Sequence, residues 1–257
     1  VVFSIPGIVD VKNKVIKFAP NLHWRNIKVD EVFRERFEFA DTLISIDNEA
    51  NFSVLAESWM GNIVKNEENI VYILINEGIG TGLIINNRLF RGYNYSAGEF
   101  GHMIINEGGR KCQCGNFGCW ERYGSIKVAV DSYNLESPYH LRGKNNEEMF
   151  DSFVDNCNKG DELAIKITED IAKELGVGIA NIVNGLDPEL VIIGGRMVKL
   201  WDYIKDALIR TIEEHAIFGS TVNLRIEPTS FKAGTSSIIG AAVYGIRKLY
   251  SGYHISV

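Results

Sequence analysis

Residues 99–121 of the chain read EFGHMIINEGGRKCQCGNFGCWE, and this stretch holds most of the chemistry that the sequence displays. Three cysteines, Cys112, Cys114 and Cys119, fall within eight residues, and His102 precedes them in the same glycine-rich stretch. Zinc takes four tetrahedral ligands from sulfur and imidazole nitrogen, and a site closed by four protein ligands is structural. The spacing therefore predicts a structural zinc site formed by these four side chains. The alternative is that three reduced cysteines pack as small hydrophobic residues.

Outward from this stretch, the apolar pattern alternates between strands and helices. It predicts strands at residues 1–9, 14–18, 43–46, 70–75, 82–85, 190–193 and 224–228. It predicts helices at residues 31–39, 50–57, 126–133, 147–156, 161–182, 200–214 and 237–249. A glycine-rich turn, residues 78–82, joins two of the strands, and residues 88–118 read as a long loop. Alternating strands and helices indicate an α/β fold.

The composition is that of a folded domain and excludes several classes of protein. Of 257 residues, 46% are hydrophobic and 23% are charged, which rules out a disordered chain or a fibrous repeat. The net charge of −6 makes the chain a poor binder of nucleic acid by itself. No apolar run approaches the ~20 residues of a membrane helix, so no membrane partner is expected. Clustered cysteines and no secretory signal predict a cytoplasmic protein. The chain begins with Val1 inside a strand, so we expect it to be the C-terminal part of a longer protein.

Polar residues follow a buried strand at Asp47–Asn51, where a helix begins. The carboxyl end of a strand in an α/β fold is where ligands bind. The same residues would equally serve as a helix N-cap, with Asp47 or Asn48 as the cap and Glu49 in the first turn. Glu99 and Glu121, at the two ends of the cysteine stretch, are ambiguous in the same way. Carboxylates and amides in such places are well suited to sugar hydroxyls.

The glutamate–histidine and cysteine motifs together resemble the signature of the ROK family, the repressors and sugar kinases of the actin-like ATPase superfamily. Further matches occur in the family's order at residues 4–7, 20–22, 48–51, 78–82, 187–188, 194–195 and 240–242. The resemblance covers essentially the whole chain. It implies a two-lobed, actin-like (ribonuclease H-like) α/β fold with a zinc-braced loop.

The resemblance also implies how the chain is divided and where its sites lie. Residues 1–47 would be a remnant of the first lobe, with the C-terminal helix 237–257 packed back on it. Residues 48–236 would form the second lobe, with the zinc loop at 98–121 and the sugar in the cleft between lobes. The family's zinc ligands match His102, Cys112, Cys114 and Cys119. Its sugar-binding positions match Gly7, Asn48, Glu99, His102 and Glu121, and Glu49 stands where the kinases have their catalytic aspartate.

Three departures from the kinase pattern favour a repressor. The first phosphate loop of the kinases has no counterpart in this chain. Asn76 and Glu77 stand where the kinases have Gly-Thr, and Glu49 replaces the catalytic aspartate. Phosphoryl transfer depends on positioning and on offsetting phosphate charge, and each departure works against it. We therefore expect no catalytic residue and weak or no ATP binding; the alternative is a truncated, ATP-dependent sugar kinase.

The resulting prediction is a sugar-sensing domain of a transcriptional repressor that resembles the xylose-repressor type. The expected effector is a monosaccharide, xylose first and glucose second, because the longer Glu49 would occupy the space of a hydroxymethyl group. DNA would be bound only by an upstream helix-turn-helix that this sequence lacks. Zinc is the expected cofactor, and a homodimer or higher homo-oligomer is the expected assembly.

Overall fold

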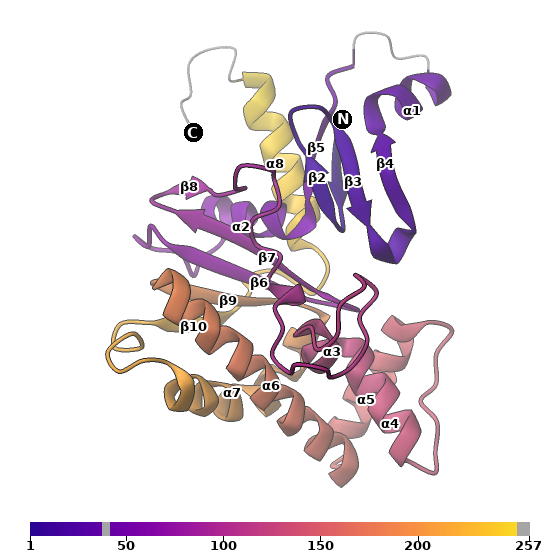
Figure 1. Cartoon of the computed structure of the whole chain (residues 1–257), viewed down its shortest axis with the longest axis vertical. Helices are drawn as coiled ribbons and strands as arrows, with labels where there is room; N and C mark the ends of the chain where they lie inside the picture. Colours follow the sequence, from indigo (N-terminus) through magenta and orange to yellow (C-terminus); the bar gives the residue numbers. More distant parts are fainter. Residues whose placement is uncertain (38–41, 251–257) are drawn as a thin grey trace. The chain divides into compact units, whose positions relative to one another are not determined.

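The computed structural model describes residues 1–37 and 42–250, and the chain forms two compact units (Figure 1). Unit 1 comprises Val1–Tyr72, Gly80–Glu99 and Thr229–Val257, and unit 2 comprises Ile73–Ile79 and Phe100–Pro228. Each unit is therefore assembled from stretches that are distant in the sequence. The predicted lobe boundary at residue 47 remains a prediction beside this division.

Unit 1 opens with two strands on either side of the Pro6-Gly7 turn, β1 (Val2–Ile5) and β2 (Ile8–Asp10). Strand β2 pairs antiparallel with β3 (Val15–Ala19), and β3 pairs antiparallel with β4 (Trp24–Lys28) (Figure 1). The sequence pattern did not predict β4, because its side chains are mostly exposed and two of the five are basic. In a separate pair, β1 runs parallel to β5 (Ser45–Asn48), with Ser4 opposite Asp47.

The helices of unit 1 are α1 (Val29–Arg36), α2 (Glu49–Met60) and α8 (Ser236–Tyr250). The predicted helix at 31–39 is confirmed up to Arg36, and residues 38 and 39 lie outside the described part of the chain. Helix α8 packs on α2 and on β1. A Cβ at Gly240 would lie 1.8 Å from the carbonyl oxygen of Phe52, so glycine is needed where these two helices meet.

Strands β6 (Ile70–Ile75), β7 (Ile79–Ile85) and β8 (Arg88–Leu89) follow α2. The predicted glycine turn at 78–82 is wrong in its extent, because β7 already begins at Ile79. Two of its glycines therefore belong to the strand. A Cβ at Gly82 would lie 2.2 Å from the carbonyl oxygen of Ala50, so this glycine serves the close approach of α2 to β7. The predicted long loop at 88–118 likewise contains β8 and a 3₁₀ turn, Phe100–His102.

Unit 2 contains most of the helices after residue 100. They are α3 (Glu121–Gly124), α4 (Ile126–Glu136), α5 (Asn146–Asn158), α6 (Glu162–Leu186) and α7 (Trp201–His215). Its strands β9 (Leu190–Gly195) and β10 (Arg225–Pro228) pair in parallel, and the full strand order is β10-β9-β6-β7-β8. All of these except the short α3 were predicted from the sequence. No helix in the described residues is long and apolar enough to cross a lipid bilayer.

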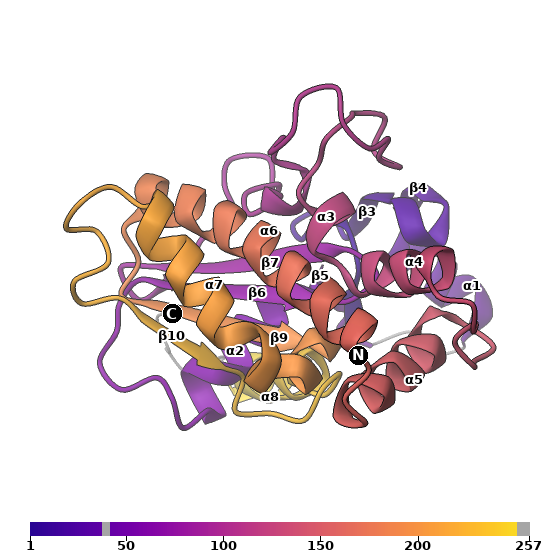
Figure 2. The ribbon, with the colours of Figure 1, turned by 90° about the horizontal axis from the view of Figure 1, so that it is seen from below.

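Helix α6 is the central helix of unit 2, and α7 packs beside it (Figure 2). Two glycines in its middle admit different neighbours. A Cβ at Gly176 would lie 2.6 Å from Cβ of Thr211 on α7. A Cβ at Gly178 would lie 2.1 Å from the ring of Trp120, which follows the last cysteine of the cluster. The helix is therefore held by α7 and by the segment that carries the cysteines.

Candidate functional site

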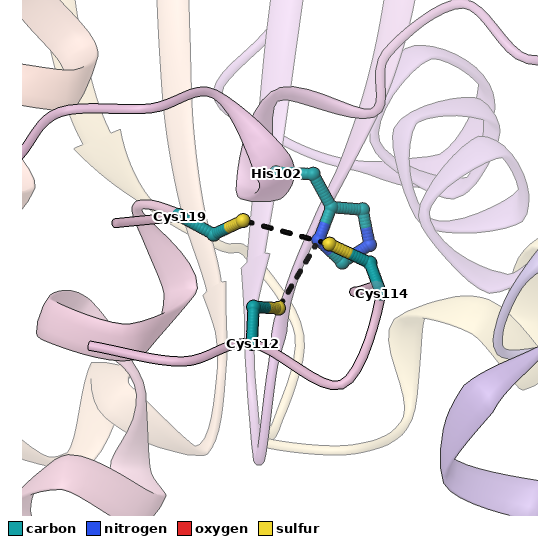
Figure 3. A group of neighbouring side chains, drawn as sticks. All are labelled: His102, Cys112, Cys114 and Cys119. Atoms are coloured by element: carbon teal, nitrogen blue, oxygen red, sulfur yellow. Dashed lines mark hydrogen bonds between the residues drawn. The ribbon is translucent and has the colours of Figure 1, made fainter. Parts of the chain in front are cut away.

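The four predicted metal ligands come together in unit 2 (Figure 3). The ligand atoms of His102, Cys112, Cys114 and Cys119 all lie within 4.8 Å of one another. Cys112 Sγ lies 3.8 Å from His102 Nδ1, and the sulfurs of Cys114 and Cys119 lie 3.6 Å apart. Zinc–sulfur bonds of about 2.3 Å in a tetrahedron place neighbouring sulfurs about 3.8 Å apart. The donor set and its spacing therefore fit a tetrahedral zinc ion.

A short network of backbone hydrogen bonds folds the cysteine loop. The Cys112 amide donates to the carbonyl of Asn116, and the Gly115 amide donates back to the carbonyl of Cys112. Gly115 and Gly118 have φ angles of +104° and +79°, which side-chain-bearing residues rarely adopt. These two glycines turn the chain tightly enough to bring all three sulfurs to one point.

Trp120 fixes this loop to the rest of unit 2. Its indole Nε1 donates a 2.9 Å hydrogen bond to the carbonyl oxygen of Glu174 in α6, and the side chain is fully buried. The ring lies against Gly178, where no side chain intervenes. A buried indole whose N–H is hydrogen-bonded is a strong packing contact, so Trp120 holds the cysteine loop against α6.

Burial raises the pKa of two of the three thiols, those of Cys112 and Cys119. Burial raises the pKa of Cys112, and its hydrogen bond to Glu121 raises the pKa further; Cys112 Sγ donates to Glu121 Oε1 at 3.0 Å. Burial, with Cys114 next to it, raises the pKa of Cys119 to about 11. Because zinc binds thiolates, metal binding at this site must release protons.

Unit 1 holds a small, mostly polar pocket. Its lining residues are Gly7, Asn48, Asn51, Gly80, Thr81, Tyr95, Ala97, Gly98 and Glu99. Three predicted sugar-binding residues, Gly7, Asn48 and Glu99, thus lie around one pocket. Glu49 is not among the residues that line it, and His102 and Glu121 belong to unit 2.

Asn48 is the N-cap of α2, as one of the two alternatives predicted, and it also lines the pocket. Its Oδ1 accepts a 2.7 Å hydrogen bond from the amide of Ala50 and caps α2. Its Nδ2 donates to the carbonyl oxygen of Gly7 at 2.8 Å. An amide nitrogen carries two N–H groups, so one is left for a bound molecule.

Asp47 does not line the pocket, but it binds residues that do. Its side chain is only 2% exposed. One carboxylate oxygen accepts from the Asn48 amide and from Asn51 Nδ2, both at 2.8 Å. The other accepts from Nε and Nη2 of Arg91, at 2.9 and 2.7 Å. Asp47 therefore fixes the first turn of α2 and the loop that follows β8.

Among the lining residues with polar side chains, Asn51, Thr81 and Tyr95 were not predicted as site residues. Asn51 lies one helical turn after Asn48, and that spacing was the available signal for it. Its Nδ2 is bound to Asp47, which leaves its carbonyl oxygen as an acceptor at the pocket. Thr81 donates to the carbonyl oxygen of Gly98, which closes the strand β7 onto the segment before Glu99.

Asn76, one of the residues that departs from the kinase pattern, contacts the segment that follows Gly194-Gly195. Asn76 Oδ1 accepts a 2.9 Å hydrogen bond from the Arg196 amide, directly after Gly194-Gly195. The Asn76 carbonyl accepts from the Ile126 amide at 3.0 Å. The Arg196 guanidinium is paired with Glu147 and Asp151. The Arg196 amide is therefore engaged by the chain itself and is not open to a phosphate oxygen.

The sequence of the chain is similar to those of known proteins. A family model described as the ROK family matches residues 1–247. The "Xylose repressor" of Caldicellulosiruptor bescii is 31% identical over 236 residues, which is 89% of this chain and 58% of that protein. The "Glucokinase" of Halalkalibacterium halodurans is 29% identical over 218 residues, 82% of this chain and 64% of that protein. The chain thus spans less than two thirds of the length of these relatives.

A solved structure extends this to three dimensions. A ROK family glucokinase from Streptomyces griseus, crystallised with glucose and AMPPNP, superposes with a TM-score of 0.80 at 24% identity. The superposition covers 94% of this chain and 79% of that one. The predicted actin-like α/β fold is therefore confirmed.

Proposed function

Because the chain belongs to the ROK family, we propose that it is the sugar-sensing part of a transcriptional repressor. The observation that carries the proposal is the polar pocket of unit 1, where Asn48, Asn51 and Glu99 meet. Their amide N–H, amide carbonyl and carboxylate groups supply both donors and acceptors, which the hydroxyl groups of a monosaccharide need. The similarity to a xylose repressor over 89% of the chain supports the same function.

The preferred sugar in this proposal is xylose, with glucose second. The reasoning rests on Glu49, which stands where the family's kinases carry an aspartate. Glu49 does not line the pocket of unit 1, so this preference is what the family resemblance implies: a side chain longer by one methylene at this position would occupy the space of the glucose hydroxymethyl group, which xylose lacks. One such group is worth roughly 10–200-fold in affinity, so the proposal is a preference and not absolute exclusion.

A sugar kinase is the second candidate, and the similarity to a glucokinase at 29% identity favours it. The contacts of Asn76 argue for the repressor instead. Its side chain binds the Arg196 amide, so this backbone donor is not open to a phosphate oxygen. Glu77 follows directly and would repel a triphosphate.

The proposal includes a structural zinc ion held by His102, Cys112, Cys114 and Cys119. The tetrahedral spacing of the four ligand atoms supports zinc, and four protein ligands leave no open position for catalysis. It also includes a cytoplasmic location, a homodimer or higher homo-oligomer, and DNA binding by a module outside this sequence, because each is what a repressor of this kind requires.

The test is titration calorimetry of the purified chain with xylose, glucose and ATP, combined with an ATP-consumption assay on the full-length protein. We expect xylose to bind more tightly than glucose, with no sugar-dependent loss of ATP. Sugar-dependent ATP consumption would establish the kinase instead. A chain that binds no monosaccharide would refute both candidates.

A further inference from the structure

The segment between Arg91 and Ala97 forms a tight loop that reaches the pocket of unit 1. The Ala97 amide donates a 3.0 Å hydrogen bond to the Arg91 carbonyl, which closes the loop at its base. The Arg91 side chain is bound to buried Asp47, and Lys17 Nζ donates to the carbonyl oxygen of Asn94 at 3.1 Å. The loop is therefore held at its base and near its tip.

Within this loop Tyr95 has a backbone conformation that its side chain disfavours. Its φ angle is +60°, in the left-handed region. A bulky side chain there is an outlier, and such strain gathers at ligand-binding positions. Of the seven described residues other than glycine with positive φ, four are asparagine or aspartate, which tolerate it, and Tyr95 is the one with a phenol ring.

Tyr95 also differs in kind from everything else around the pocket. The lining is otherwise glycine, alanine, threonine, asparagine and glutamate. A pyranose presents hydroxyl groups at its edge and C–H groups on its faces, so it needs an apolar surface as well as polar partners. Tyr95 supplies the one aromatic ring among the lining residues. Its hydroxyl has no hydrogen-bond partner within the described part of the chain, so it remains open to a ligand.

We propose that Tyr95 is a sugar-binding residue, whose ring packs against the C–H face of the bound pyranose. This inference rests on the proposed function of the pocket and deepens it. The strained backbone of Tyr95 is then maintained for binding and not for folding. Replacing Tyr95 by glycine should relieve the backbone strain and remove the aromatic ring in one substitution.

The experiment measures thermal midpoint and affinity for xylose and glucose in the wild type, Tyr95→Gly, Tyr95→Phe and Tyr93→Gly. Tyr93 is the matched control, because it lies in the same loop and is 98% exposed. We expect Tyr95→Gly to keep or raise the midpoint while its affinity falls roughly 10-fold or more, the scale of one lost buried group. Tyr95→Phe, which keeps the ring, should stay within about 3-fold of the wild type, as expected for a contact dominated by the ring face. Tyr93→Gly should bind like the wild type.

Three other results would overturn the inference in distinguishable ways. If the wild type binds sugar and Tyr95→Gly binds it equally well, Tyr95 is not a binding residue, while the proposed function stands. If midpoint and affinity fall together in Tyr95→Gly, the residue holds the loop and does not contact sugar. If the wild type binds neither sugar, the proposed function fails and this inference fails with it.

Discussion

The ion pair between Asp47 and Arg91 should be the most sensitive polar contact in unit 1. Removing the guanidinium in Arg91→Ala leaves a carboxylate that is 2% exposed without two of its four donors. Breaking a buried pair by removing one partner costs about 3–5 kcal/mol. Arg91 itself is 24% exposed, so we expect the lower end, about 3 kcal/mol. At roughly 2–4 °C per kcal/mol, the thermal midpoint should fall by about 6–12 °C.

The assay is a double-mutant cycle of Arg91→Ala and Asp47→Asn, read by urea unfolding. Because the two residues bind each other, the losses of stability in the two single mutants should add up to more than the loss in the double mutant. We expect a difference of about 2 kcal/mol, within the usual range for coupled neighbours. The control is the exposed pair Lys173–Asp170, both 58% exposed at 3.0 Å, where Asp170→Asn should change stability by less than about 1 kcal/mol. Additive effects of Arg91→Ala and Asp47→Asn would refute the reasoning.

The remaining predictions address the metal, the sugar and acid stability. Cys114→Ser should lose the zinc and lower the thermal midpoint, since metal-binding energy is folding energy; elemental analysis that still finds zinc in the variant would contradict this. Glu49→Asp should reduce the preference for xylose over glucose from roughly 10–200-fold, and calorimetry that finds an unchanged ratio would show that Glu49 does not select the sugar. The pKa of Asp161 lies below its ordinary 3.8 because its carboxylate accepts from the Tyr133 hydroxyl and from the Ala164 amide. Its charged form therefore stabilises the fold above about pH 4, and this contribution is lost as pH falls through the lowered pKa. In unfolding curves measured at successive pH values, Asp161→Asn should lose less stability than the wild type as pH falls. An unchanged loss would assign the acid sensitivity to other carboxylates.

The group of one histidine and three cysteines could be predicted from sequence because all four residues are local. His102 and the three cysteines lie within one loop, where spacing and glycines already define the geometry. Most helices and strands were predictable for a similar reason, since their apolar periodicity is contained within each segment. Strand β4 was missed because its side chains face solvent, so no hydrophobic alternation marks it.

The pocket was predicted only in part, because its walls come from separate stretches of chain. Resemblance to the family supplied Gly7, Asn48 and Glu99. Thr81 and Tyr95 join them through contacts that no local pattern records, such as the hydrogen bond from Thr81 to Gly98 and the closure of the Tyr95 loop. The glycines of β7 were wrongly predicted as part of a turn for the same reason. Gly82 is required by the close approach of the Ala50 carbonyl, which is far away in the sequence.

The two glycines in the middle of α6, Gly176 and Gly178, have a consequence for the order in which unit 2 becomes protected from solvent. Glycine in a helix interior costs about 1 kcal/mol relative to alanine, so the middle of α6 forms weakly by itself. It becomes stable when α7 docks at Gly176 and Trp120 docks at Gly178. Because Trp120 directly follows Cys119, amide hydrogens near Glu174 should exchange slowly only while the cysteine loop is held by its metal. Hydrogen exchange in the centre of a long helix would thus report whether an ion is bound in a loop outside that helix.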